Sequence, residues 1–255
     1  MTSKITFADI GLGIIGSAAV IAVWEIAARG GFIDPAIFPS PTIAVQSAAE
    51  KLTGTEVLEH VAWSLFRVTT GFLLGAIAGL VIGIIAGWYR FAGSILVPLI
   101  ELLRPIPPLA WIPLAIIWFG LGEPSKFFMI FLGAFFPMVT AAYRGVISVD
   151  PVLIRAAQAY GLKGIRLLFQ VAIPGAMPDL ATGVRIGWGL SFGILVAAEL
   201  IAADRGLGFM IMHARLSGYV DVIVVGIFLI GLLNLLTDAL LVWLIRKSMG
   251  RWHEV

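Results

Sequence analysis

The residue types that most often carry out catalysis or bind metals are scarce in this chain. It has no cysteine, which excludes disulfides, thiol catalysis and cysteine-ligated zinc. Its three histidines, His60, His213 and His253, are far apart in the sequence, and their spacing does not indicate a metal site. No Walker A sequence is present to hold ATP phosphates. We therefore expect no catalytic site, no metal site and no cofactor in this chain.

Charged side chains inside long apolar stretches are the stronger candidates for function. Glu101 and Arg104 lie three residues apart, close enough to pair along a helix. Arg185 and Glu199 lie near opposite ends of one apolar stretch, and Asp238 lies in another. A charge in lipid costs roughly 2.5–3.5 kcal/mol on insertion scales, so these groups should face the interior of a helix bundle. There they are either paired structural groups or part of a substrate route.

The composition places these charges in a membrane protein. Of the 255 residues, 60% are apolar and only 13% are charged, against roughly 25% charged residues in ordinary soluble proteins. The mean hydropathy is +1.03 and the net charge is only +2. A soluble domain needs more polar side chains than this to cover its surface, which argues against a soluble enzyme and a nucleic-acid binder. We predict an integral membrane protein.

Six segments are apolar enough to cross the hydrocarbon as helices, for which about 20 residues are needed. We predict one all-α membrane domain, residues 1–255, with a cytoplasmic connection at about 148–179. Lysine and arginine favour the side that holds the N-terminus, nine against six, so both termini are predicted to be cytoplasmic. The predicted spans are residues 10–28, 68–88, 95–119, 127–146, 183–203 and 222–245.

Two local patterns modify this bundle. Four prolines between Pro105 and Pro113 cannot all lie in an ordinary helix, so the third span should be broken and lie against protein or a water-lined cavity. Glycine recurs every fourth residue along the second span, at positions 71, 75, 79, 83 and 87. This ladder predicts a helix face on which a neighbouring helix packs closely, with a sliding contact as the alternative.

The connection between the fourth and fifth spans has the pattern of a short helix–turn–helix. Asp150 and Pro151 suit the first positions of a helix, and Gly161 suits a sharp turn with positive φ. A second amphipathic helix is predicted to run to about Val171 and to end before Pro174. An exposed element with apolar and basic faces is a docking surface for a partner.

With this element the sequence resembles the permease subunits of binding-protein-dependent ABC importers. Their EAA loop reads Glu-Ala-Ala, three residues, glycine, nine residues and then Ile-x-Leu-Pro. The corresponding residues of this chain, to which the resemblance assigns coupling with the ATPase, are Arg155, Ala156, Ala157, Gly161 and Pro174. Arg155 departs from the pattern by replacing the glutamate, whereas the loop geometry rests on Gly161 and Pro174.

Two further segments, residues 104–122 and 197–208, are similar to the taurine, alkanesulfonate and nitrate branch of that family, and most of all to taurine permeases. The resemblance implies a subunit that forms the path for a small sulfonate, with taurine first, in a bacterial inner membrane. It also implies a second copy of this subunit, a periplasmic binding protein and two ATPase subunits that carry ATP and magnesium. This chain would then be a transport subunit and not itself an enzyme.

A sulfonate path gives the intramembrane charges separate roles. Arg104 stands beside the proline-broken segment and is the best-placed cation for an anion. Glu199 would repel an anion, so we expect it to act as a gate or latch, held by Arg205 or by a backbone donor. The candidates for the pathway or its gate are Arg104, Trp111, Arg185 and Glu199.

Other functions stay open at this stage. An importer of alkanesulfonates, nitrate or another small anion would share these features. An ion-coupled secondary transporter could bind protons on the intramembrane carboxylates, but we detect no inverted repeat, and the EAA-type loop argues against it. An intramembrane enzyme would need a nucleophile with a base, or a metal site, within the spans, and the sequence offers no such set.

Overall fold

The computed structural model describes residues 7–32, 34 and 36–249, and all regular structure in that part of the chain is helical. The predicted all-α class is confirmed. In chain order the elements are α1 (Phe7–Arg29), α2 (Pro41–Lys51), α3 (Gly54–Trp88), α4 (Arg90–Leu103), the 3₁₀ helix η1 (Pro108–Trp111), α5 (Ile112–Phe119), α6 (Glu123–Ile147), α7 (Pro151–Ala159), α8 (Gly164–Leu167), the π-helix η2 (Leu168–Ala172), α9 (Ile173–Ala202), α10 (Leu207–Leu216) and α11 (Val220–Met249).

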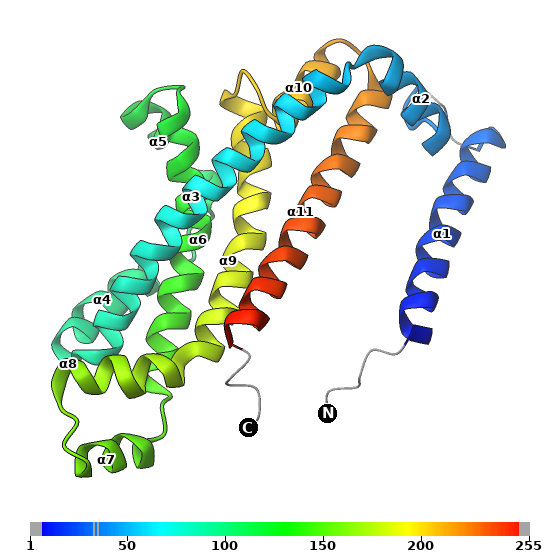
Figure 1. Ribbon diagram of the computed structural model, residues 1–255. Coiled ribbons are helices and arrows are strands. Elements are labelled where there is room, and N and C mark those ends of the chain that lie inside the picture. The colour runs from blue at the N-terminus through cyan, green and yellow to red at the C-terminus, as the bar shows by residue number, and fades with distance from the viewer. Residues whose placement is uncertain (1–6, 33, 35, 250–255) are drawn as a thin grey trace.

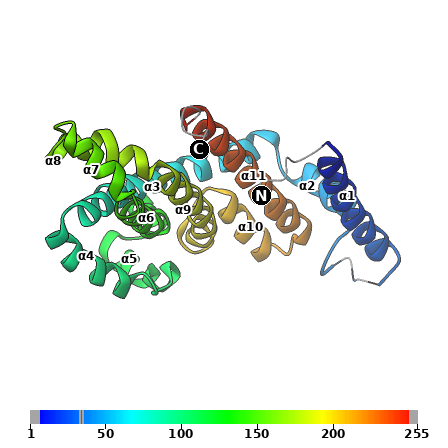
Figure 2. The ribbon, with the colours of Figure 1, turned by 90° about the horizontal axis from the view of Figure 1, so that it is seen from below.

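The long helices run side by side between two ends of the molecule (Figure 1). One end, which we call the α10 end, holds α2, α10 and the start of α3. The other, the α7 end, holds α7, α8 and the last turns of α6. Seen from the α7 end, α6 and α9 lie in the middle, with α4 and α5 on one side and α11 and then α1 on the other (Figure 2). The helix α1 packs on α2, and its Trp24 stacks on Phe228 of α11 with ring centroids 5.7 Å apart.

Five helical segments are long and apolar enough to cross a membrane, and a sixth candidate is a bent pair. The pair joins α4 to the segment Pro108–Phe119 at an angle of 87°. The break predicted within the span 95–119 is therefore confirmed. The bend follows from Pro105, Pro107 and Pro108, because each lacks the N–H that would continue a helix. The five long segments are Gly11–Arg29, Gly54–Trp88, Glu123–Ile147, Gly164–Ile201 and Val220–Lys247.

Several helices extend beyond the predicted boundaries. The helix α3 begins at Gly54, well before the predicted start at 68, so the segment between the first two predicted spans holds both α2 and the first turns of α3. A capping box fixes this start: the Glu56 N–H donates to Thr53 Oγ1 at 3.3 Å, and the Thr53 N–H donates to Glu56 at 2.9 Å. Because these first turns contain polar residues, a search for apolar runs does not detect this part of the helix. The segment between the predicted spans 183–203 and 222–245 likewise contains a helix, α10.

The glycine ladder of α3 packs against α6, as predicted. A Cβ added to Gly71 would lie 2.6 Å from the side chain of Ile130, and one added to Gly83 would lie 2.5 Å from the carbonyl oxygen of Val139. A Cβ on Gly87 would lie 2.9 Å from Val146. Real Cβ atoms do not approach other atoms this closely, so the two backbones are in contact along their shared length. The ladder therefore fixes α3 on α6, which carries one wall of the cavity described below.

The helix–turn–helix begins as predicted but does not end as predicted. Asp150 accepts a hydrogen bond from the Val152 N–H at 2.7 Å and caps α7, and Gly161 has φ +87° in the turn. The chain is then helical from Gly164 to Ala202, through Pro174. The π-helix η2 ends at Ala172, two residues before Pro174, and its wider turn accommodates a ring that would clash with an ordinary α-turn. The predicted helix end before Pro174 is therefore wrong.

Candidate functional site

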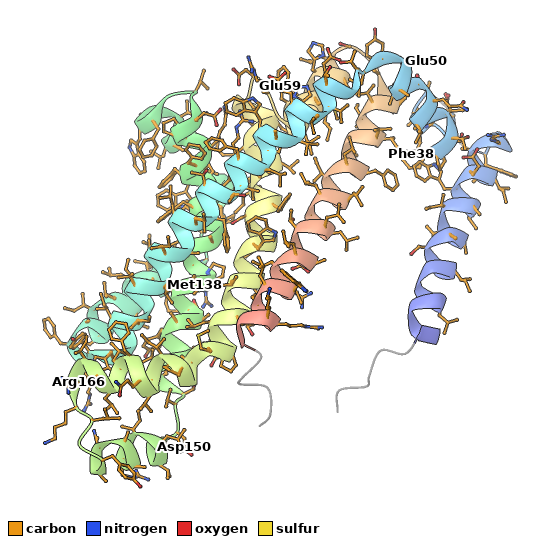
Figure 3. The ribbon with its side chains drawn as sticks, viewed as in Figure 1. Phe38, Glu50, Glu59, Met138, Asp150 and Arg166 are labelled. Atoms are coloured by element: carbon orange, nitrogen blue, oxygen red, sulfur yellow. The ribbon has the colours of Figure 1, made fainter. Side chains whose placement is uncertain are left out.

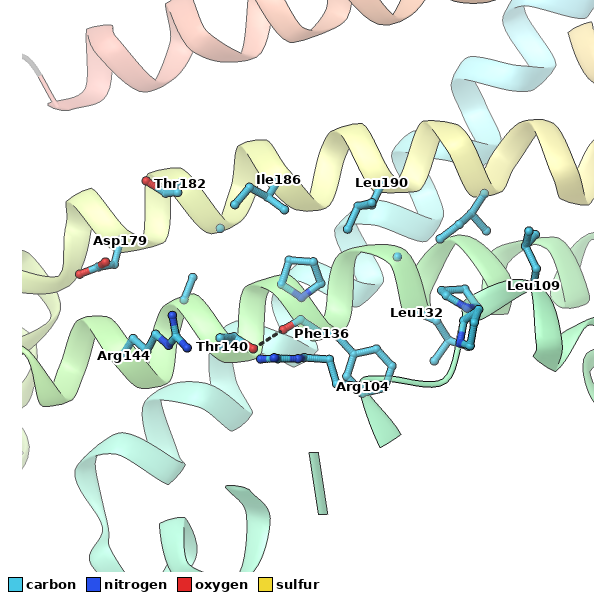
Figure 4. A pocket seen from close by; sticks show the side chains of 17 residues that line it. Arg104, Leu109, Leu132, Phe136, Thr140, Arg144, Asp179, Thr182, Ile186 and Leu190 are labelled. Carbon is cyan, nitrogen blue, oxygen red and sulfur yellow. Dashed lines mark hydrogen bonds between the residues drawn. The ribbon is translucent and has the colours of Figure 1, made fainter. Parts of the chain in front are cut away.

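A cavity of about 530 Å³ lies between α6, α9 and the break in the bent pair (Figure 4). This volume is within the range of about 300–1,000 Å³ that is usual for ligand pockets. The break supplies one wall through Arg104, Pro107, Pro108 and Leu109, and η1 contacts both α6 and α9. The lining residues are Arg104, Pro107, Pro108, Leu109, Leu132, Gly133, Phe136, Pro137, Thr140, Ala141, Arg144, Asp179, Thr182, Gly183, Ile186, Leu190 and Ile194.

The two halves of this cavity differ in polarity. Leucine and isoleucine side chains line the half toward the α10 end, whereas Thr140, Arg144 and Asp179 lie in the half toward the α7 end (Figure 4). Thr140 donates its hydroxyl proton to the Phe136 carbonyl at 2.9 Å, and this bond is drawn in the figure. The hydroxyl oxygen can still accept a bond from a ligand. The cavity is therefore amphipathic along its length.

Arg104 lies on the cavity wall and also forms the predicted pair with Glu101. The Arg104 Nη1 to Glu101 Oε1 distance is 3.1 Å. The two side chains are 42% and 51% exposed, so this ion pair stabilises the helix by little, of the order of 0–1 kcal/mol. The Arg104 guanidinium has further N–H donors that are not bonded to Glu101. Arg104 can therefore bind an anion without breaking a buried contact.

Trp111 and Arg185 were candidates from sequence, but neither lines this cavity. Trp111 packs against the rings of Trp118 and Phe128, with centroids 6.4 Å away in both cases. Arg185 donates two hydrogen bonds to Asp238 of α11, with distances of 3.2 and 3.3 Å. The structure thus places Trp111 in the aromatic packing of the bent pair and Arg185 in a contact between α9 and α11.

Glu199 is only 1% exposed and is held by three neighbours. Arg67 Nη1 lies 2.9 Å from Glu199 Oε1, the Ser64 hydroxyl lies 2.9 Å from both carboxylate oxygens, and the Gly208 N–H donates to Glu199 Oε2 at 2.9 Å. The predicted backbone donor is confirmed. The predicted cation, Arg205, is wrong, because its side chain turns away from Glu199 and pairs with Glu59.

Arg67 is the centre of this buried cluster. Its guanidinium donates two hydrogen bonds of 2.7 Å to Glu123, at the start of α6, and a further one to the backbone carbonyl of Arg205. Lys126 also lies 2.9 Å from Glu123 and is buried. The cluster therefore ties α3, α6 and α9 together at the α10 end. The sequence analysis did not single out Arg67 because it lies one residue before the predicted span 68–88.

The loop that follows α9 completes this cluster with its backbone. The N–H groups of Gly206 and Leu207 donate to His60 Nδ1 at 3.1 Å and to the Ser64 hydroxyl at 2.9 Å. Gly206 has φ +120°, and a Cβ there would collide with the carboxylate of Glu199. Glycine is therefore required at this position both for its backbone angle and for its lack of a side chain.

The helix–turn–helix projects from the α7 end, where Figure 3 labels its Asp150 and Arg166. It carries the residues assigned to coupling: Arg155 and Ala156 are exposed, Ala157 is half-buried, and the exposed Gly161 forms the turn. Pro174 lies farther on, inside α9. Large apolar side chains of this element are mostly exposed, namely Val152, Leu153, Tyr160, Ile165 and Phe169.

These features together define a class of protein. A bundle of apolar helices, broken beside a cavity and carrying an exposed apolar helix–turn–helix at one end, is typical of a membrane transport subunit that works with a partner. Within the residues described, no group of three or more histidine, aspartate or glutamate residues is placed to hold a metal ion.

Comparison with known proteins identifies the family. The family model for the inner membrane component of binding-protein-dependent transport systems matches residues 79–249, and the chain belongs to this family. It is 41% identical over 249 residues to the taurine transport system permease protein TauC of Escherichia coli (strain K12), which covers 94% of this chain and 89% of TauC. It is 38% identical over 234 residues to SsuC of the same organism, which is named for aliphatic sulfonate transport, with 92% and 89% covered.

A solved structure has the same fold. A chain from the inward-facing MetNI methionine ABC transporter superposes with a TM-score of 0.50 at 21% identity, over 73% of this chain and 93% of that chain. The chain is thus the permease component of an ABC importer, a multi-pass inner membrane protein that acts with ATPase and substrate-binding subunits.

Proposed function

We propose that this chain lines the path by which a small sulfonate, with taurine as the first candidate, crosses the inner membrane. The observation that carries the proposal is the cavity beside the broken helix, whose polar half holds the guanidinium groups of Arg104 and Arg144. A sulfonate in a low-dielectric bundle needs a compensating positive charge and hydrogen-bond donors, and these two residues supply both. The names of TauC and SsuC support a sulfonate as the cargo.

In the proposed importer, two copies of this chain associate with two ATPase subunits and one periplasmic binding protein. The α7 end and both termini face the cytoplasm, and the exposed apolar side chains of α7 and α8 dock on the ATPase. ATP and magnesium bind to that subunit, and this chain holds no cofactor. Arg155, Ala156 and Ala157 lie in the docking helix, Gly161 sets the angle of its turn, and Pro174 stiffens the return into α9.

The buried cluster at the α10 end is proposed to act as the outer latch. Glu199 holds α9 to α3 through Arg67, while Arg67 holds α3 to α6 through Glu123. Opening toward the binding protein would require movement between these helices, and the cluster resists that movement because its charges are buried and paired. Glu199 therefore acts on the path without contacting the substrate.

The proposal is tested with the complete importer in proteoliposomes, with its binding protein outside and ATP inside. We expect uptake of taurine and stimulation of ATP hydrolysis by the taurine-loaded binding protein. Uptake that is driven by a proton gradient and needs no ATP would contradict the proposal and support a secondary transporter.

An importer of alkanesulfonates, nitrate or another small anion is the second candidate. The guanidinium groups of Arg104 and Arg144 suit any small oxyanion, and this favours keeping the alternative. The same assay distinguishes the two candidates when ethanesulfonate and nitrate replace taurine. Equal or greater stimulation by either anion would shift the proposed cargo from taurine to that class.

A further inference from the structure

The polar half of the cavity contains charges of both signs that do not neutralise each other. Arg144, in the last turns of α6, forms no hydrogen bond or ion pair through its side chain with any residue that the structure describes. Asp179, on the facing turn of α9, accepts one long hydrogen bond from the described residues, from the Ser148 hydroxyl at 3.4 Å. Figure 4 shows both side chains at the same end of the cavity. Two opposite charges thus share one space without a direct contact.

This arrangement is unusual within the molecule. Arg185 and Asp238 join α9 to α11 through two hydrogen bonds, and Arg67 and Glu199 are in contact at 2.9 Å. In both of these pairs, which join helices, the cation and the carboxylate are in direct contact. The separation of Arg144 from Asp179 therefore leaves room for a ligand that carries both charges.

We propose that Arg144 and Asp179 form the two poles of a binding site for a zwitterionic aminosulfonate. Arg144, together with Arg104, binds the sulfonate group, and Asp179 binds the ammonium group at the other end of the molecule. The inference rests on the proposed function, and it assigns two residues to substrate recognition that the sequence did not single out. The apolar half of the cavity offers no comparable donors or acceptors.

In this site Asp179 determines the selectivity between aminosulfonates and simple anions. A carboxylate that faces a cavity repels a simple anion. When a bound ligand displaces water from that carboxylate without pairing with it, the carboxylate loses hydration and gains nothing in return. An ammonium group removes both penalties. An aminosulfonate is therefore favoured over an alkanesulfonate of the same length and over nitrate, although all three can bind the guanidinium groups.

The test measures binding to the permease–ATPase complex in lipid nanodiscs, without nucleotide or binding protein. Taurine and ethanesulfonate are titrated by calorimetry, because they differ only in the amino group. We expect the wild type to bind taurine about tenfold or more tightly than ethanesulfonate. Asp179→Asn, which keeps the side-chain shape, should remove this preference, whereas Arg144→Gln should weaken both ligands about tenfold.

Matched controls come from the contact between α9 and α11. Arg185→Gln and Asp238→Asn make the same chemical changes in a pair that does not line the cavity, and they should leave both affinities unchanged. Should Arg144→Gln fail to assemble, Arg144→Lys keeps the charge and should keep the preference for taurine.

Three results would overturn the site. These are no preference in the wild type, an unchanged preference in Asp179→Asn, and loss of the preference in Arg144→Lys. The ATP-driven uptake of taurine is measured separately on the same wild-type preparation. Uptake without a binding preference would reject this site while the proposed function stands, and absent uptake would reject the proposed function itself.

Discussion

A cluster of charged side chains is buried and paired at the α10 end of this molecule, whereas the charged side chains in the cavity toward the α7 end are exposed or unpaired among the described residues. At the α10 end, Arg67 is fully buried and bonded to Glu199, to Glu123 and to a backbone carbonyl. In the cavity toward the α7 end, Arg104 is half-exposed in a loose pair, and the side chain of Arg144 has no partner among the described residues. A saturated buried charge holds helices in place, whereas an accessible unsaturated charge is free to bind a ligand. The comparison separates structural groups from candidate substrate groups.

The largest effect is expected from Arg67→Ala. This change leaves Glu199 buried without its cation, and breaking a buried pair from one side costs about 3–5 kcal/mol. The free energy of unfolding should fall by that amount, or folded complex should be lost altogether, as measured by size-exclusion chromatography and thermal unfolding. Arg185→Ala removes one partner of an exposed pair and should cost less than about 1 kcal/mol. Similar losses for both variants would contradict the contrast between the two regions.

A smaller effect is expected from Glu199→Gln. The amide can still accept a hydrogen bond from the Gly208 N–H but loses its charge beside Arg67, which weakens the latch by about 1–3 kcal/mol. ATP hydrolysis without the binding protein should then rise several-fold. The matched control is Glu101→Gln, in the exposed pair with Arg104, which should leave basal hydrolysis unchanged. Unchanged hydrolysis and transport in Glu199→Gln would mean that its charge does not contribute to a latch.

Gly161→Val tests the coupling element at the α7 end. Gly161 has φ +87° with no atom near its missing Cβ, so a side chain there costs roughly 1–2 kcal/mol in backbone strain alone. We expect the spans to insert normally but the ATPase to co-purify less well. Gly218, with φ +76° and equally open space between α10 and α11, is the matched control. Gly218→Val should carry the same strain and keep the ATPase. Equal co-purification of the ATPase with both variants would rule out the coupling role of the turn.

The smallest effect on stability is expected at Arg104. Its exposed pair with Glu101 is worth at most about 1 kcal/mol, so Arg104→Gln should assemble at normal levels. Transport of taurine should nevertheless fall about tenfold, because the cavity loses a charged donor, and Arg104→Lys should retain part of it. Normal transport by both variants would remove Arg104 from the path, and loss of assembled protein would make it a structural residue.

Several parts of this protein follow from the sequence because their signals lie close together in the chain. Runs of apolar residues predict the membrane helices, since the hydrocarbon accepts only a backbone that satisfies its own hydrogen bonds. The prolines after Arg104 predict the break, the glycines of α3 predict close packing, and Gly161 predicts the turn. Each of these is a property of a few neighbouring residues. Local signals can still mislead, as at Pro174, where a π-turn allows the helix to continue through a proline.

Only the tertiary structure decided which distant charges meet. Glu199 pairs with Arg67, 132 residues away, and not with nearby Arg205, because the packing of α3 on α9 and the reversal at Gly206 bring the distant residue closer. In the same way, Arg144 and Asp179 share a cavity because α6 and α9 lie face to face beside the broken helix. The partner of a buried charge depends on the three-dimensional packing of whole helices, which no local pattern of residues encodes.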